Sequence, residues 1–155
     1  YPLNTVVIGK KEIIWVPIFG WLFVAAGNVR IDRGNRHKAI NGLDQALDVI
    51  VARKHSVLVF PEGTRNRSGD SMLPFKKGAF HMAFKSGMPI VPIVSSPLRP
   101  IVDAPRKHMV PGTVHMKVLA PIDSRQFASV DALLEETQRR MLETYRGLKT
   151  VVGRA

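Results

Sequence analysis

The stretch S-V-L-V-F-P-E-G-T-R, from Ser56 to Arg65, joins a short apolar run to a polar loop at Pro61. A run rich in β-branched and aliphatic residues that a proline stops is typical of a buried strand in an α/β sheet. Open α/β sheets bind their ligands beyond the carboxyl ends of the strands. We therefore expect an α/β fold whose chemistry lies in the loop that begins at Pro61.

The sequence on either side alternates helical and extended patterns. Five segments carry them: helices at 37–54, 78–86 and 131–146, and strands at 89–94 and 113–119. Gly87 is the expected end of the second helix. In the last strand the alternation predicts that Met116 and Val118 face the core while Lys117 faces solvent. The order predicts one α/β domain, 1–155, with a mainly parallel or mixed sheet flanked by helices.

Composition limits the possible partners. Hydrophobic residues make up 45% of the chain, which excludes a disordered protein, and the absence of cysteine excludes disulfides and thiolate chemistry. The 23 Lys and Arg against 12 Asp and Glu give a formal charge of +11, which favours a partner that carries phosphate, such as nucleic acid, anionic lipid or a metabolite. No zinc-finger spacing or aromatic RNA-binding pattern accompanies the charge, so no nucleic acid is expected.

Residues 13–29 carry no charge and contain four large aromatic side chains. These are Trp15, Phe19, Trp21 and Phe23. A helix that crosses a bilayer needs about 20 apolar residues, and Pro17 and Gly20 interrupt this shorter segment. Two readings stay open, a helix packed in the core and a segment that rests in the membrane interface.

The loop after Phe60 offers groups suited to a phosphate. Gly63 lets the backbone approach a ligand closely, Thr64 offers a hydroxyl, and Arg65 presents paired donors that match two phosphate oxygens. Glu62 could orient Arg65 or a substrate hydroxyl. The alternative is a surface turn with a local ion pair between Glu62 and Arg65.

Four ordered blocks stand out in the chain: G-N-V-R-I-D-R at 27–33, F-P-E-G-T-R at 60–65, L-P-F-K-K-G-A-F-H at 73–81 and V-P-I-V at 91–94. Together they resemble the glycerolipid acyltransferase family, most closely its bacterial 1-acyl-sn-glycerol-3-phosphate acyltransferases. A wider family spacing, K-x2-L-x6-G-x12-R, is met by Lys10, Gly20 and Arg33, with Ile13 in place of the leucine.

One family block is absent. Its N-H-x4-D motif supplies a histidine base and an aspartate that orients it, yet none of the five histidines here has an aspartate five residues later. We therefore expect no catalytic dyad in this chain. The simplest hypothesis places the dyad upstream of Tyr1, in a longer enzyme of which this chain is an N-terminally truncated piece that is inactive alone.

The resemblance implies transfer of a fatty acyl group from acyl-CoA or acyl-carrier protein to the 2-hydroxyl of lysophosphatidic acid, giving phosphatidic acid without a cofactor or metal. The implied phosphate-binding residues are Arg65, Arg33, Lys10, Gly63, Thr64 and Glu62. The residues expected to contact the acyl chain or the membrane are Trp15, Phe19, Trp21 and Phe23. The implied location is the cytoplasmic face of the bacterial inner membrane, on an anionic surface, with the protein peripheral or anchored by segments outside this chain.

Alternatives remain at several points. The chain could be a catalytically dead relative that binds lipid or phosphate, or an acyltransferase for another acceptor such as glycerol 3-phosphate. Lys76 and Lys77 could face the membrane or the acyl donor, or form a solvated pair. His81 has no assigned role.

Overall fold

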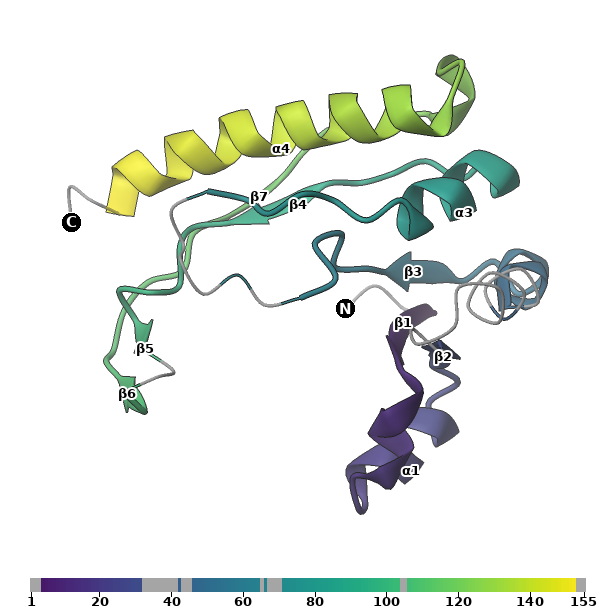
Figure 1. The fold of residues 1–155 in the computed structure, drawn as a ribbon, viewed down its shortest axis with the longest axis horizontal. Helices are drawn as coiled ribbons and strands as arrows, with labels where there is room; N and C mark the ends of the chain where they lie inside the picture. Colours follow the sequence, from purple (N-terminus) through teal and green to yellow (C-terminus); the bar gives the residue numbers. More distant parts are fainter. Residues whose placement is uncertain are drawn as a thin grey trace. The chain divides into compact units, whose positions relative to one another are not determined.

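A computed structural model describes residues 4–31, 42, 46–64, 66, 71–103 and 106–152 (Figure 1). The chain divides into two units, Tyr1–Phe60 and Pro61–Ala155, and each has its own strands and its own buried residues. The single domain expected from chain length stays a prediction.

The first unit contains a three-stranded sheet in which all neighbouring strands run parallel. Its strands are β1 (Thr5–Lys10), β2 (Val29–Ile31) and β3 (Ser56–Leu58). β1 is central, with Ile8 opposite Val29 and Thr5 opposite Ser56. Because parallel strands end at the same edge, the chain leaves all three strands on the side where an α/β sheet binds its ligands.

The strand predicted from the apolar run 56–60 is confirmed as β3, although β3 ends at Leu58 and is shorter than the run. The helix predicted over 37–54 is confirmed over 46–52, and its earlier apolar positions, Ile40 and Leu43, lie outside the described residues. Leu47 and Ile50 are buried, as their helical spacing predicted. The connection from β1 to β2 contains two further elements, η1 (Lys11–Trp15) and α1 (Phe19–Ala25).

The second unit packs two helices on an antiparallel pair of strands. Its elements are α3 (Gly78–Ser86), β4 (Ile93–Ser95), β5 (Val102–Asp103), β6 (His108–Met109), β7 (Met116–Val118), η2 (Ser124–Gln126) and α4 (Val130–Val152). In Figure 1 the yellow helix α4 runs along the β4–β7 pair, with α3 near its first turns. Gly87 ends α3 at a φ of 69°, a left-handed conformation that glycine adopts without strain. The predicted α/β fold with a mixed set of strands is confirmed.

The predicted face of the 113–119 strand is wrong. Met116 and Val118 are 66% and 63% exposed within the structure. All three residues of β7 are exposed, Lys117 as predicted, and Lys117 lies directly opposite Val94, which is buried beneath α4. The buried residue of this strand pair is therefore on β4, and alternation along β7 alone does not reveal that.

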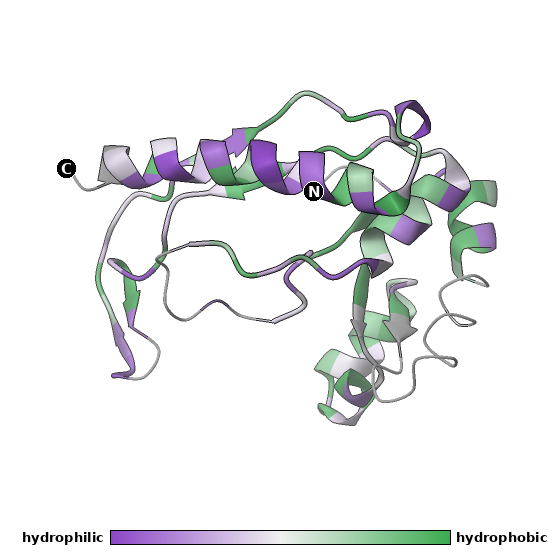
Figure 2. Ribbon diagram, turned by 45° about the horizontal axis from the view of Figure 1, so that its top comes forward, coloured by the Kyte–Doolittle hydropathy of each residue, from purple (hydrophilic) through white to green (hydrophobic). Residues whose placement is uncertain are grey.

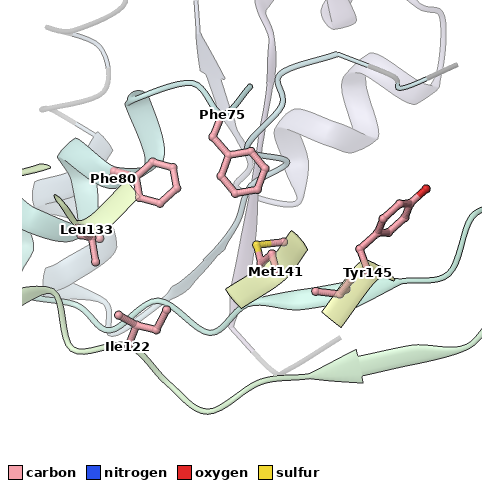
Figure 3. Packing of buried hydrophobic residues seen from close by; sticks show 8 residues of the cluster. Phe75, Phe80, Ile122, Leu133, Met141 and Tyr145 are labelled. Atoms are coloured by element: carbon pink, nitrogen blue, oxygen red, sulfur yellow. The ribbon is translucent and has the colours of Figure 1, made fainter. Parts of the chain in front are cut away.

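The core of the second unit lies between α3, α4 and the strands (Figure 3). Along α4 the buried positions Leu133, Thr137, Met141 and Tyr145 recur every four residues, which places them on one face of the helix. Thr137 lies on this apolar face because its hydroxyl donates a hydrogen bond of 2.7 Å to the Leu133 carbonyl. Ser124 is fully buried for the same reason, since its hydroxyl donates to the carbonyl of Ala83 on α3.

Candidate functional site: a loop suited to phosphate

The loop that follows β3 turns sharply at a glycine. Gly63 has a φ of +67°, where other residues are strained, and a Cβ atom on it would lie 3.2 Å from Cγ of Lys76. Both observations explain why glycine occupies this position. They also show that the side chain of Lys76 passes directly beside the loop, a contact that the sequence reading missed.

Two hydrogen bonds hold the loop against residues 71–76. The Lys76 N–H donates to the Pro61 carbonyl at 2.7 Å. The Leu73 N–H donates to the Glu62 carboxylate, but burial outweighs this bond and raises the pKa of Glu62 above its usual value. The L-P-F-K-K-G block therefore positions the P-E-G-T turn, although the two are separate motifs in the sequence.

The structure brings together only part of the predicted phosphate site. Glu62, Gly63 and Thr64 share the turn, whereas Arg65 and Arg33 lie outside the described residues. Lys10 is the last residue of β1, and its backbone lies opposite Ile31, two residues before Arg33 in the sequence. The register thus places Lys10, the first residue of the K-x2-L-x6-G-x12-R spacing, at the carboxyl edge of the first unit's sheet.

The aromatic segment forms an exposed apolar surface in the first unit. Figure 2 shows that the ribbon of α1 is largely hydrophobic. Trp15, Phe19 and Trp21 are 83%, 54% and 69% exposed, whereas Phe23 is half-buried and contacts Gly9. Among the described residues, no helix combines the length and the hydropathy that a bilayer span requires. Contact of these side chains with an acyl chain or the membrane stays a prediction.

Gly20 allows this aromatic segment to fold back on itself. An ideal Cβ on Gly20 would lie 2.5 Å from the Ile13 carbonyl oxygen and 2.6 Å from that of Ile14. These are backbone atoms that cannot move aside cheaply. The glycine of the K-x2-L-x6-G-x12-R spacing thus has a structural cause, since α1 can pack on η1 only if position 20 has no side chain.

We expect Gly20→Ala to lower the free energy of unfolding of the first unit by about 1–3 kcal/mol. Urea titration followed by tryptophan fluorescence measures this directly, because both tryptophans of the chain lie in this segment. Gly147→Ala, followed by circular dichroism because it lies on α4 of the second unit, is the control, since Gly147 is also helical but has open space around its Cβ position, and it should stabilise by about 0.5–1 kcal/mol. Equal or greater stability of Gly20→Ala would contradict the contact.

The remaining candidate residues are His81, Lys76 and Lys77. His81 lies on α3 with its side chain exposed. Within the described ranges, no three His, Asp or Glu side chains are grouped closely enough to hold a metal ion. Lys77 forms an ion pair with Asp131 at the start of α4, whereas Lys76 lies at the loop.

Comparison with known proteins identifies the class. Residues 1–96 match the family described as Acyltransferase. The chain therefore belongs to the acyltransferase family.

Relatives within this family carry one name. The chain is 42% identical to the 1-acyl-sn-glycerol-3-phosphate acyltransferase of Escherichia coli K12 over 123 residues, 79% of this chain and 49% of the relative. It is 33% identical to the protein of that name from Saccharomyces cerevisiae over 149 residues, 94% of this chain and 49% of the relative. The chain thus spans about half the length of these relatives.

A solved structure has the same fold. The crystal structure of the 1-acyl-sn-glycerophosphate acyltransferase PlsC from Thermotoga maritima is similar with a TM-score of 0.73 and 26% sequence identity. The similarity covers 96% of this chain and 57% of that protein. The fold expected from the resemblance is thereby confirmed.

Proposed function

We propose that this chain forms the acceptor-binding part of an O-acyltransferase that converts lysophosphatidic acid to phosphatidic acid. The acyl donor is acyl-CoA or acyl-carrier protein, and the new ester forms at the 2-hydroxyl of the glycerol. The observation that carries the proposal is the P-E-G-T turn, which turns at a left-handed glycine and is held by hydrogen bonds from the 71–76 segment at the start of the second unit. Family membership and the shared name of the relatives support the reaction.

The reaction assigns a role to each group. The acceptor hydroxyl attacks the thioester carbonyl, a base takes the hydroxyl proton, and the tetrahedral oxyanion collapses with loss of the thiolate, which is reprotonated. Cations hold the acceptor phosphate in place, so that the hydroxyl on the same glycerol is oriented toward the thioester carbonyl and the base. Arg65 binds the phosphate bidentately, Arg33 and Lys10 add positive charge, and Thr64 donates its hydroxyl.

The base comes from outside this chain in this proposal. A histidine and an aspartate in the N-H-x4-D arrangement, encoded upstream of Tyr1, supply it. That the chain spans about half of its relatives' length supports this part of the proposal. His81 takes no part, because it lies on a different block from the family's base.

The test is acyl transfer by the full-length protein to a panel of acceptors, with the product identified by mass spectrometry. We expect ester formation on lysophosphatidic acid at a rate well above that on glycerol 3-phosphate or lysophosphatidylcholine. A preference for glycerol 3-phosphate would replace the proposed acceptor. Lysophosphatidic acid binding without turnover would instead identify a lipid-binding relative.

We further propose that the exposed aromatic surface of η1 and α1 rests in an anionic membrane interface. Three large side chains that are more than half exposed, with no charged residue between positions 13 and 29, are typical of interfacial segments. The charge of +11 favours approach to anionic lipid. Association of this kind is peripheral, and it leaves open an anchor elsewhere in the protein.

Leu22→Glu tests this surface, because Leu22 is 63% exposed on α1. We expect partitioning of the 155-residue chain onto phosphatidylglycerol vesicles to fall roughly tenfold, since a buried leucine contributes about 1.5–3 kcal/mol. The blue shift of Trp15 and Trp21 emission reports binding. Met109→Glu makes the same charge change at a residue 72% exposed on β6, and it should have little effect. Equal losses in both variants would contradict the proposed surface.

A further inference from the structure

Two adjacent lysines of the second unit lie in different surroundings. The Nζ atom of Lys77 is 2.7 Å from a carboxylate oxygen of Asp131, so this lysine pairs with the first turn of α4. Lys76 is exposed, and within the described part of the chain no carboxylate lies in ion-pair distance of it. The K-K pair therefore contains one neutralised charge and one that is available to a ligand.

The stem of Lys76 is fixed beside the P-E-G-T turn. The backbone N–H of Lys76 donates a hydrogen bond to the Pro61 carbonyl at 2.7 Å. The side-chain Cγ of Lys76 lies 3.2 Å from the position that a Cβ on Gly63 would occupy. A lysine whose stem packs along a turn carries its ammonium group within a few ångströms of that turn. The acidic residue of the turn, Glu62, accepts a hydrogen bond from the Leu73 N–H, and among the described residues it forms no ion pair with Lys76.

We propose that Lys76 is a phosphate-binding residue of the acceptor site and that its ammonium group contacts a phosphomonoester seated at the P-E-G-T turn. This inference rests on the proposed function and adds a cation that the E-G-T-R motif does not contain. An ammonium group is a compact point charge that can follow a phosphate as the glycerol moves, whereas a guanidinium fixes its orientation. Lys76 thus complements the bidentate contact assigned to Arg65.

The same contacts argue against the other roles open to a surface lysine. A lysine that only raises the surface charge needs no contact with the turn, whereas the stem of Lys76 lies against Gly63. An adjacent lysine with a structural ion pair, Lys77, provides the internal control. If the K-K pair served only to raise the surface charge, both residues would act alike.

The experiment compares three variants of the full-length protein: Lys76→Met, Lys76→Arg and Lys77→Met. Methionine keeps most of the stem that packs on Gly63 and removes the charge, and arginine keeps the charge. Binding of short-chain lysophosphatidic acid is measured by calorimetry below its micelle concentration, and KM is measured for the acceptor and for acyl-CoA. Direct binding separates this inference from the proposed reaction, because it needs no turnover.

We expect Lys76→Met to weaken lysophosphatidic acid binding and to raise its KM about tenfold, the effect of one charge-assisted hydrogen bond. Lys76→Arg should stay within about threefold of the wild type, Lys77→Met within about twofold, and KM for acyl-CoA should not change. Equal effects of Lys76→Met and Lys77→Met, loss of affinity for acyl-CoA instead, or an arginine variant as weak as the methionine variant would each overturn the assignment. Absence of lysophosphatidic acid binding by the wild type would overturn it together with the proposed acceptor.

Discussion

Replacement of Arg65 by alanine in the full-length protein is expected to lower kcat/KM for lysophosphatidic acid by roughly 100- to 1000-fold. Two charge-assisted hydrogen bonds to one phosphate contribute together about 3–4 kcal/mol when the guanidinium meets the phosphate edge to edge. Arg65 follows in sequence a turn that Gly63 and the hydrogen bond from the Lys76 N–H to the Pro61 carbonyl hold in place. Steady-state kinetics with varied acceptor measures the loss.

Two further variants make this result specific. Arg65→Lys should recover part of the activity, because lysine restores the charge but not the paired donors. Arg53→Ala removes the same charge from an exposed position before β3 and should stay within about twofold of the wild type. Activity of Arg65→Ala within threefold of the wild type would contradict the role of Arg65 in binding the acceptor.

Phe80→Ala should cause the largest loss of stability, about 3–5 kcal/mol. Phe80 is 2% exposed on α3 and lies near Phe75 (Figure 3). The two rings are stacked, with centroids 6.1 Å apart. Truncation to alanine leaves a cavity in the core that α3 and α4 share, because the surrounding buried side chains are close-packed and Ser124 holds α3 through the Ala83 carbonyl.

Urea unfolding followed by circular dichroism measures the effect of Phe80→Ala. Phe84→Ala is its matched control, since Phe84 lies four residues later on the same helix and is 39% exposed. We expect the control to lose no more than about a third of the free energy that Phe80→Ala loses. Similar losses would mean that Phe80 is not the centre of this core.

Secondary structure could be predicted from the sequence where local signals mark both ends of an element. Gly87 supplies the left-handed residue that ends α3, and the helical pattern over 131–146 identifies the central part of α4. The face of β7 could not be predicted, because alternation alone does not specify which side α4 covers. That choice depends on the register of Val94 against Lys117, which is a tertiary contact.

The candidate site also has a part that local sequence signals predict and a part that depends on tertiary contacts. The loop chemistry of Glu62, Gly63 and Thr64 follows from the residues, because glycine and hydroxyl groups after a strand favour an anion. The contribution of Lys76 does not, since nothing local distinguishes it from Lys77. Two contacts distinguish the lysines: the hydrogen bond from the Lys76 backbone N–H to the Pro61 carbonyl, and the ion pair of Lys77 with Asp131.

The exposed aromatic surface was open to two readings in the sequence for a physical reason. Composition cannot distinguish a segment packed in a core from one packed against lipid, because both remove the same apolar area from water. The structure places Trp15, Phe19 and Trp21 at the surface of their unit, which favours contact with lipid over core packing.

The most direct test of the central claim compares two proteins: the 155-residue chain and the same chain extended upstream to its natural start. Thioester-dependent acyl transfer to lysophosphatidic acid is measured for both under identical conditions. We predict turnover by the extended protein and at least about a thousandfold less by the shorter chain, because a missing histidine base removes proton transfer from the reaction. Equal activity of the two proteins, or none in the extended protein, would contradict the account.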